Sequence, residues 1–342
     1  MVTKETDERF MRRCIQIARN GLLKAKPNPS VGAVIVDAGG RIIGEGYTSA
    51  FGGPHAEVNA FASVRPEDET LLPGATIYVS LEPCSHWGKT PPCCDFIIRK
   101  GVRRVVCGSV DPFAKVQGRG IQRIREAGIE VTVGVLEKEC IESNKRFFVF
   151  NTQHRPYILL KWAQSADGFI DDHYQPTLFS TPFTQMLAHK LRAENDAILV
   201  GRITMMRDKP RLNVREWTGH DPQRITLTHH EEGAELLEYC YGGGWKAFND
   251  IDETLDWMYN NGRQSLIVEG GAATINSFIA RGLWDEIRVE TAPKLVGDGT
   301  RAPKIPDGAV ERSRDVFDGN SIAYYTRPHN LSLRKIRIKK IP

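Results

Sequence analysis

Hydrophobic residues recur at two alternating spacings through the first 150 residues. Apolar side chains three and four positions apart, such as Phe10, Cys14 and Ile17, predict an amphipathic helix that ends near Gly21. Short apolar runs between turn residues predict strands. The pattern predicts strands at 31–36, 41–47, 75–81, 102–108 and 129–135, and helices from about 55, then at 94–100, 121–127 and 137–148. We therefore expect a central sheet covered by helices.

A polar break at residues 151–156 interrupts this alternation and is the expected linker. Beyond it, the pattern predicts strands at 157–163, 197–201, 224–228, 265–268 and 286–291, and helices at 183–193, 252–259 and 270–279. Asp318-Gly319-Asn320 predicts a hairpin turn between the last two strands. We expect two α/β domains, residues 1–150 and 151–342, with no repeat that relates them.

Composition agrees with two ordinary globular domains. The chain has 342 residues, which is long for a single core, and it is 41% hydrophobic and 26% charged. No apolar run approaches the ~18 residues of a membrane span. The net charge is +4, and because residues 331–342 hold five basic and no acidic side chains, the rest is close to neutral. Composition alone therefore does not support a nucleic-acid-binding face.

The expected cellular compartment determines how the cysteines are interpreted. The first eight residues mix charges of both signs without an apolar core, which predicts no signal peptide and a cytoplasmic protein. The chain has seven cysteines, and in a reducing compartment disulfides are not expected. Cys84, Cys93 and Cys94 lie within eleven residues of one another. A metal site is the first explanation to test.

One pattern predicts a catalytic zinc site. His55 and Glu57 form a His-x-Glu string, and Cys84 follows Pro83, with Cys93 nine residues later. One histidine and two cysteines suit tetrahedral zinc and leave the fourth position for water. The Glu57 carboxylate can take a proton from that water and return it to a leaving amine. The pattern is typical of zinc deaminases, but the long Cys84–Cys93 spacing points away from cytidine and transfer-RNA deaminases.

Other interpretations of these residues stay open. His55 could be a structural histidine, and the cysteines could be buried thiols or part of a structural zinc knuckle with His86 nearby. Cys94 competes with Cys93 as the third ligand. We favour Cys93 and a catalytic zinc site, because Glu57 is correctly spaced and no fourth donor is obvious.

Five strings in the first half carry a family resemblance. Residues 27–32, 53–58 and 81–94 resemble the bifunctional riboflavin-biosynthesis deaminase/reductase family, as do 111–112 and 116–120. The resemblance implies a cytidine-deaminase-like three-layer α/β/α domain. It also implies hydrolytic deamination of 2,5-diamino-6-ribosylamino-4(3H)-pyrimidinone 5′-phosphate. Asn28 is implied to help hold the pyrimidine, although a residue between two prolines suits a turn equally well.

The second half carries a weaker motif and further resemblance. Gly270-Gly271 follows a predicted strand and opens a helix, whose N-terminus favours phosphate, although such glycines can also be purely steric. Residues 161–168, 191–201, 210–215 and 292–297 resemble the family's reductase half. That half is dihydrofolate-reductase-like, and it passes a hydride from NADPH to the opened ribose to give a ribityl chain.

The resemblance also implies particular contacts in the second half. Substrate contacts are implied for Arg192, Leu212, Arg215 and Glu269. Contacts to NADP are implied for Ala163, Thr204, Asp208, Gly271, Ala272, Ala273, Thr274 and Ser277. A guanidinium fork can hold phosphate, although each arginine could also be simply solvated. A homodimer that acts on a small pyrimidine ribotide, without nucleic acid or membrane, is expected.

Several positions depart from the family's usual strings. Leu178-Phe179-Ser180 stands where Trp-Ile-Thr is usual, Asp208-Lys209-Pro210 where Asp-Asp-Pro is, and Thr228-His229 where Asp-Ser is. Residues 229–251 are also shorter and richer in glycine than usual. One alternative is therefore an active deaminase with a non-reducing C-terminal domain. A nucleic-acid base deaminase anchored by residues 331–342 is the other alternative, although those residues also alternate like a terminal strand.

Overall fold

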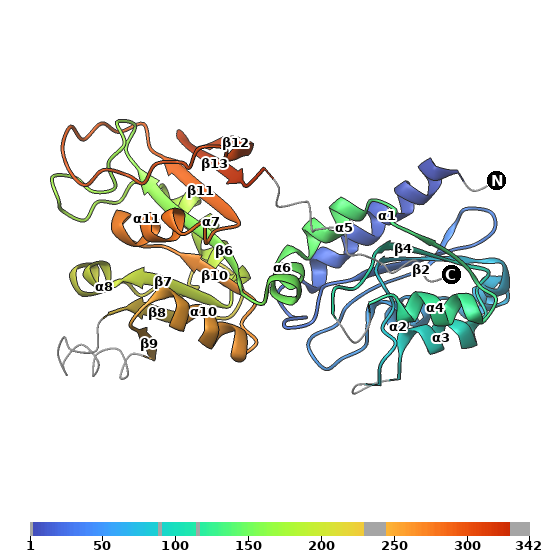
Figure 1. The fold of residues 1–342 in the computed structure, drawn as a ribbon. Coiled ribbons are helices and arrows are strands. Elements are labelled where there is room, and N and C mark those ends of the chain that lie inside the picture. Colours follow the sequence, from blue (N-terminus) through green and yellow to red (C-terminus); the bar gives the residue numbers. More distant parts are fainter. Residues whose placement is uncertain (1–2, 88–90, 114–116, 229–243, 329–342) are drawn as a thin grey trace. The chain divides into compact units, whose positions relative to one another are not determined.

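The structure is a computed structural model that describes residues 3–87, 91–113, 117–228 and 244–328 (Figure 1). The chain divides into two compact units after Gln153. His229 and the basic segment 331–342, both singled out by the sequence, lie outside the described residues. Among the described residues, no helix is both long and apolar enough to cross a membrane.

The first unit is built on a five-stranded sheet with the strand order β2-β1-β3-β4-β5. Its strands are β1 (Gly32–Val36), β2 (Ile42–Tyr47), β3 (Thr76–Leu81), β4 (Arg104–Ser109) and β5 (Glu130–Val133). β1 runs antiparallel to β2 and β3, whereas β3, β4 and β5 are parallel. Each expected strand of this half is present, shifted by no more than two residues at either end.

Helices cover both faces of this sheet, which gives the expected three layers (Figure 1). One face carries α1 (Lys4–Ala18) and α5 (Glu137–Ser143), and the other carries α2 (Ala56–Ala62), α3 (Cys93–Lys100) and α4 (Arg119–Glu126). The apolar stripe of α1 packs with Val34 and Tyr78 of the sheet. The unit also contains two 3₁₀ helices, Arg19–Gly21 and Pro66–Gly74.

The predicted helix over 137–148 is wrong as a single element. The chain forms two helices there, α5 and α6 (Lys145–Gln153), which are separated at Asn144. The Asn144 side chain accepts from the backbone N–H of Ser30 at 2.8 Å and donates to its carbonyl at 3.0 Å. That contact spans more than a hundred residues, so local periodicity could not reveal it. Because α6 continues to Gln153, the first half of the expected linker is helical.

The second unit is built on an eight-stranded sheet with the order β12-β13-β11-β6-β10-β7-β8-β9. Its strands are β6 (Tyr157–Gln164), β7 (Ala197–Gly201), β8 (Gln223–Leu227), β9 (Trp245–Phe248), β10 (Ser265–Val268), β11 (Glu286–Thr291), β12 (Val310–Phe317) and β13 (Asn320–Thr326). The six strands from β11 to β9 are parallel, and the β12–β13 hairpin is antiparallel. The hairpin turn at Asp318-Gly319 confirms the sequence-based expectation.

The helices among the described residues of this unit are α7 (Pro182–Glu194), α8 (Arg202–Asp208), α10 (Ile251–Asn260) and α11 (Ala272–Ala280). Neither α8 nor β9 was expected from the pattern. Every residue of the central strand β10 is buried, and α11 begins a few residues after it. Since the carboxyl ends of parallel strands meet at one edge, side chains following β6, β7 and β10 share that edge.

Candidate active sites

Three side chains of the first unit converge at the carboxyl end of β3. His55 is the N-cap of α2, Cys93 is the first residue of α3, and Cys84 follows β3. The Nδ1 atom of His55 lies 3.3 Å from the Sγ of Cys93 and 3.6 Å from the Sγ of Cys84. The three donor atoms all lie within 4.8 Å of one another. Residues far apart in the sequence are thus brought together as the spacing predicted.

The donor set fits zinc. Typical Zn–S and Zn–N bond lengths place neighbouring donors of a tetrahedral site about 3.6 Å apart. The two His55–cysteine distances are close to that value. Cys94 is directed elsewhere, with its thiol 3.6 Å from the Asp95 carboxylate. Among the described residues, no further His, Cys, Asp or Glu joins the group, which disfavours a four-ligand knuckle.

The surroundings prepare these residues for metal and proton chemistry. A hydrogen bond from the Cys93 side chain lowers the pKa of Cys84 to about 4, aided by His55 and opposed by burial. Two helix N-termini meet here, and their positive ends also favour thiolates. Glu57 lies in the first turn of α2 and is 4% exposed, and burial raises its pKa to about 7. A carboxylate poised near neutral pH can both take and give a proton.

A buried carboxylate that the sequence reasoning missed organises the next loop. Glu82 accepts four backbone N–H groups, from Asp111 at 3.2 Å, Gly118 at 2.8 Å, Gly120 at 3.0 Å and Ile121 at 3.4 Å. A Cβ at Gly120 would collide with the carbonyl oxygen of Pro83. The segment that leads into α4 is therefore fastened directly beside Pro83 and Cys84. An acidic residue at the end of an apolar strand was the available signal.

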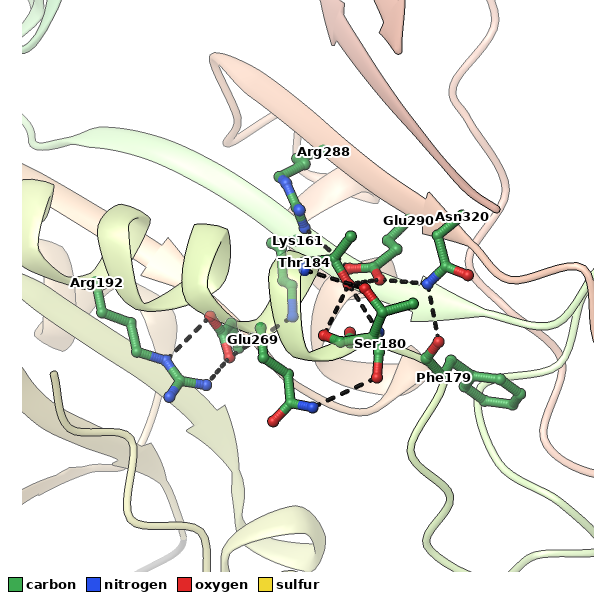
Figure 2. Close-up of polar contacts among 11 residues, drawn as sticks. Lys161, Phe179, Ser180, Thr184, Arg192, Glu269, Arg288, Glu290 and Asn320 are labelled. Carbon is green, nitrogen blue, oxygen red and sulfur yellow. Dashed lines mark hydrogen bonds and ion pairs between the residues drawn. The ribbon is translucent and has the colours of Figure 1, made fainter. Parts of the chain in front are cut away.

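The second unit gathers charge at the carboxyl end of β10 (Figure 2). Arg192 of α7 holds Glu269 through two atoms, with Nη2 2.8 Å from Oε2 and Nε 3.4 Å from Oε1. Lys161 of β6 lies 4.0 Å from the same carboxylate. All three side chains are largely buried. Two cations thus face one carboxylate, and the surplus positive charge favours an anionic ligand.

The sequence assigned no role to Lys161, although a lysine within an otherwise apolar strand was a usable signal. Burial alone would raise the pKa of Glu269, but Lys161 and Arg192 outweigh it and lower that pKa to about 2. Burial lowers the pKa of Lys161, which makes it a readier proton donor than an exposed lysine.

The remaining predicted substrate contacts lie in two turns. Leu212 is buried, and Arg215 is exposed, with its guanidinium 3.3 Å from the Asn213 side-chain oxygen and 3.5 Å from Glu216. In the first unit, the backbone N–H of Asn28 donates to Ala25 at 2.9 Å, so Asn28 does lie in a turn.

The predicted cofactor contacts lie mainly around the start of α11. The N–H of Gly271 donates to Thr204 Oγ1 at 3.2 Å, which ties this turn to α8. Thr274 packs against Gly201, at the end of β7. Ala272 and Ala273 supply first-turn backbone N–H groups, as a phosphate site requires.

Three of the predicted cofactor contacts lie further along their elements. Ala163 is on β6, Asp208 is paired with Arg207 at the end of α8, and the Ser277 hydroxyl donates to the Ala273 carbonyl at 2.9 Å.

A second buried network fixes the segment before α7 (Figure 2). Glu290 Oε1 accepts from the Thr184 hydroxyl at 2.6 Å and from the Asn320 amide at 2.7 Å, and Asn320 also donates to the Phe179 carbonyl at 2.9 Å. Leu178, which stands where the family's tryptophan is usual, is 71% exposed. These hydrogen bonds hold the segment before α7 beside Lys161, Arg192 and Glu269, and they do so without an aromatic ring at position 178.

Comparisons with known proteins identify the family. Residues 4–109 match the cytidine and deoxycytidylate deaminase zinc-binding region, and residues 156–316 match the RibD C-terminal domain. The riboflavin biosynthesis protein RibD of Aquifex aeolicus is 37% identical over 340 residues, which cover 92% of this chain and 94% of that protein. The chain belongs to the RibD family. RibD of Escherichia coli is 34% identical over 86% of this chain and 90% of its own length.

Solved structures support the same assignment across both units. A deaminase/reductase from Thermotoga maritima matches with a TM-score of 0.84 and 33% identity, and covers 95% of this chain and 99% of its own. RibD of Acinetobacter baumannii matches with a TM-score of 0.83 and 29% identity over 94% of this chain and 99% of its own. This RibD-family chain is a riboflavin-biosynthesis enzyme with a zinc-binding deaminase domain and a dihydrofolate-reductase-like reductase domain. The sequence-based fold class is confirmed.

Proposed function

We propose that the chain catalyses two consecutive steps on one pyrimidine ribotide. Residues 1–150 deaminate 2,5-diamino-6-ribosylamino-4(3H)-pyrimidinone 5′-phosphate, and residues 151–342 reduce the ribosyl chain of the product to ribityl with NADPH. The Thermotoga maritima relative carries the corresponding deaminase and reductase names. The observation that carries the proposal is the convergence of His55, Cys84 and Cys93 beside the buried Glu57.

In the deaminase, His55, Cys84 and Cys93 hold the metal, and Asn28 helps to hold the pyrimidine. Zinc bound there supplies the Lewis acidity that lowers the pKa of a water molecule. Glu57 would take a proton from the attacking water as the water oxygen adds to the amine-bearing ring carbon. Glu57 then gives the proton to the departing amino group, which leaves as ammonia. Because Glu57 is buried beside the metal donors, its carboxylate stays close to the attacking water and to the departing amino group.

In the reductase, bound NADPH would supply the hydride that reduces C1′ of the ribose, and the bond from C1′ to the ring oxygen would break. The ring oxygen must then gain one proton. Lys161 is the buried acid beside Glu269, and we assign it that proton. Arg192, Leu212, Arg215 and Glu269 hold the sugar phosphate.

We assign the NADP contacts to the residues around α8 and α11. They are Ala163, Thr204, Asp208, Gly271, Ala272, Ala273, Thr274 and Ser277.

One coupled assay tests the proposal. Purified wild-type protein receives the diaminopyrimidine ribotide, and ammonia release and NADPH oxidation are recorded separately. Glu57→Gln keeps the shape but not the base, so we expect ammonia release to fall by about 10²- to 10⁴-fold, with NADPH oxidation falling alongside. Ammonia without NADPH oxidation in the wild type would favour the non-reducing alternative. No ammonia from zinc-loaded protein would contradict the substrate assignment.

We also propose a cytoplasmic homodimer that does not bind nucleic acid. None of the six described cysteines forms a disulfide, which supports a reducing compartment. Sedimentation at several protein concentrations tests the dimer. RNA binding measured against salt, which should show neither affinity nor a steep slope, tests the absence of a nucleic-acid partner.

A further inference from the structure

The segment from Leu212 to Glu216 carries two proposed substrate contacts but belongs to no helix or strand. Leu212 has φ = 50°, in the left-handed region that branched side chains rarely adopt. Such a conformation persists only where surrounding contacts impose it. The groups that hold this segment therefore decide where Arg215 is placed.

Helix α7 supplies two of these groups, one turn apart. The Nδ1 atom of His189 accepts the backbone N–H of Arg215 at 3.2 Å. Arg192 Nη1 donates to the backbone carbonyl of Asn213 at 3.5 Å. His189 is 1% exposed, so water does not readily replace it as the acceptor. A third contact, from the N–H of Val214 to Asp221 at 2.7 Å, comes from the same loop.

Only a neutral imidazole with an unprotonated Nδ1 can accept this hydrogen bond. Burial lowers the pKa of His189, and the charges of Arg192 and Arg215 lower it further. Glu216, whose carboxylate is 3.9 Å from Nε2, and the backbone of Asn213 act in the opposite direction. At neutral pH the ring therefore stays uncharged and available as an acceptor.

We infer that His189 is a positioning residue of the reductase. By accepting the Arg215 N–H, it holds residues 212–216 in the conformation that presents Arg215 to the phosphate of the pyrimidine ribotide. The inference rests on the proposed function, because it takes Leu212 and Arg215 as substrate contacts. His189 acts through the loop, so it affects binding of the ribotide and not binding of NADPH.

The test compares wild type, His189→Leu and His189→Asn as full-length proteins. Leucine removes the acceptor at similar volume, whereas the asparagine side-chain oxygen can occupy a place near that of Nδ1. Each protein receives the deaminated ribotide and NADPH, and KM is measured for both. Ammonia release from the diamino substrate reports the other domain in the same preparation, and thermal unfolding reports folding.

For His189→Leu we expect the KM for the ribotide to rise about tenfold, as loss of one buried hydrogen bond implies. The KM for NADPH and ammonia release should stay within about twofold, and His189→Asn should recover most of the lost affinity. As the pH is lowered, the wild-type KM for the ribotide should rise more steeply than that of His189→Asn, which cannot titrate, and this rise should begin below the pH at which an exposed histidine is protonated, because the pKa of His189 is lowered.

Two outcomes would overturn this inference. One is an unchanged ribotide KM in His189→Leu. The other is an equal rise of both KM values with no recovery in His189→Asn, which would indicate a purely structural role. Wild-type protein that does not oxidise NADPH at all would contradict the proposed reductase function, and the inference would fall with it. Wild-type turnover with an unchanged KM in the variant would contradict the His189 inference alone.

Discussion

Two adjacent cysteines of the deaminase domain differ in what their thiols face. Cys93 lies 3.3 Å from His55, whereas Cys94 lies beside Asp95. We expect Cys93→Ala to weaken zinc binding by more than about 100-fold, since loss of an outer-shell partner alone can cost 10- to 100-fold. Cys94→Ala is the matched control and should keep one zinc per chain. Metal content and chelator competition measure both, and equal zinc loss in the two variants would contradict the assignment of Cys93.

The buried carboxylate of the reductase domain makes stability depend on pH. Glu269 has a folded pKa of about 2, below its unfolded value, so its stabilising contribution is complete above about pH 4.5 and is lost as the pH falls towards 2. That shift corresponds to about 3 kcal/mol at neutral pH. We expect Glu269→Gln to lower the unfolding free energy of the reductase domain by about this amount at pH 7, because Lys161 and Arg192 would keep their buried charge.

Thermal unfolding from pH 7 down to pH 3 measures this effect. The stability difference between wild type and Glu269→Gln should narrow below about pH 4.5, where the Glu269 carboxyl of the unfolded chain begins to be protonated while that of the folded protein still keeps its charge. Glu126→Gln, on the exposed surface of α4, is the control and should stay close to wild type throughout. A stability difference that does not change with pH would show that Glu269 stabilises the domain through its packing and not through its charge.

Residues that belong to a recognisable motif could be predicted, and residues outside such motifs could not. His55, Glu57, Cys84 and Cys93 form a His-x-Glu and Pro-Cys pattern, so they could be grouped although His55 and Cys84 are 29 residues apart. Glu82 and His189 belong to no such motif, and although Glu82 is visible as an acidic residue at the end of an apolar strand, nothing near either residue in the sequence identifies its partners. Lys161 was visible only as a charge in an apolar strand.

At the scale of elements, the loop that Glu82 fastens depends on one close approach. Gly120 has no room for a Cβ because the backbone carbonyl of Pro83 lies there. We expect Gly120→Ala to displace this loop and the Cys84 backbone, and to lower ammonia release by at least about tenfold, as small misplacements of catalytic groups do. NADPH oxidation with deaminated ribotide should be unchanged.

The control for that variant is Gly74→Ala, whose added Cβ would meet only the Ala38 side chain at an ordinary 3.9 Å. This variant should release ammonia at close to the wild-type rate. If Gly120→Ala also does so, the loop is not coupled to the metal site.

Elements with strong periodicity or alternation were predicted within a few residues, and short or interrupted ones were not. The strand β10 is fully buried, and its apolar run was sufficient to place it. The helix α8 has seven residues, fewer than two turns, and Met205 is its one buried residue; the four residues of β9 show neither alternation nor a continuous apolar run. The break between α5 and α6 at Asn144 depends on a hydrogen bond with Ser30, and this contact forms only when the chain is folded.

At the scale of the whole molecule, each proposed reaction draws its residues from one unit with its own core. The zinc donors and Glu57 belong to the first sheet, and Lys161, Arg192 and Glu269 belong to the second. The two activities should therefore be separable by substitution. We expect Lys161→Met to lower NADPH oxidation by about 10²- to 10⁴-fold, as loss of a proton donor does, while ammonia release stays near wild type.

Separable sites predict that two defective proteins can complement each other. Glu57→Gln retains the reductase, and Lys161→Met retains the deaminase, so neither alone should oxidise NADPH when given the diamino ribotide. Mixed in equal amounts, they should do so after a lag, because the deaminated product must leave one protein and reach the other. The lag should shorten as protein concentration rises. Glu57→Gln supplied with deaminated ribotide controls for its reductase, and a mixture that releases ammonia but oxidises no NADPH would show that the intermediate does not pass between chains.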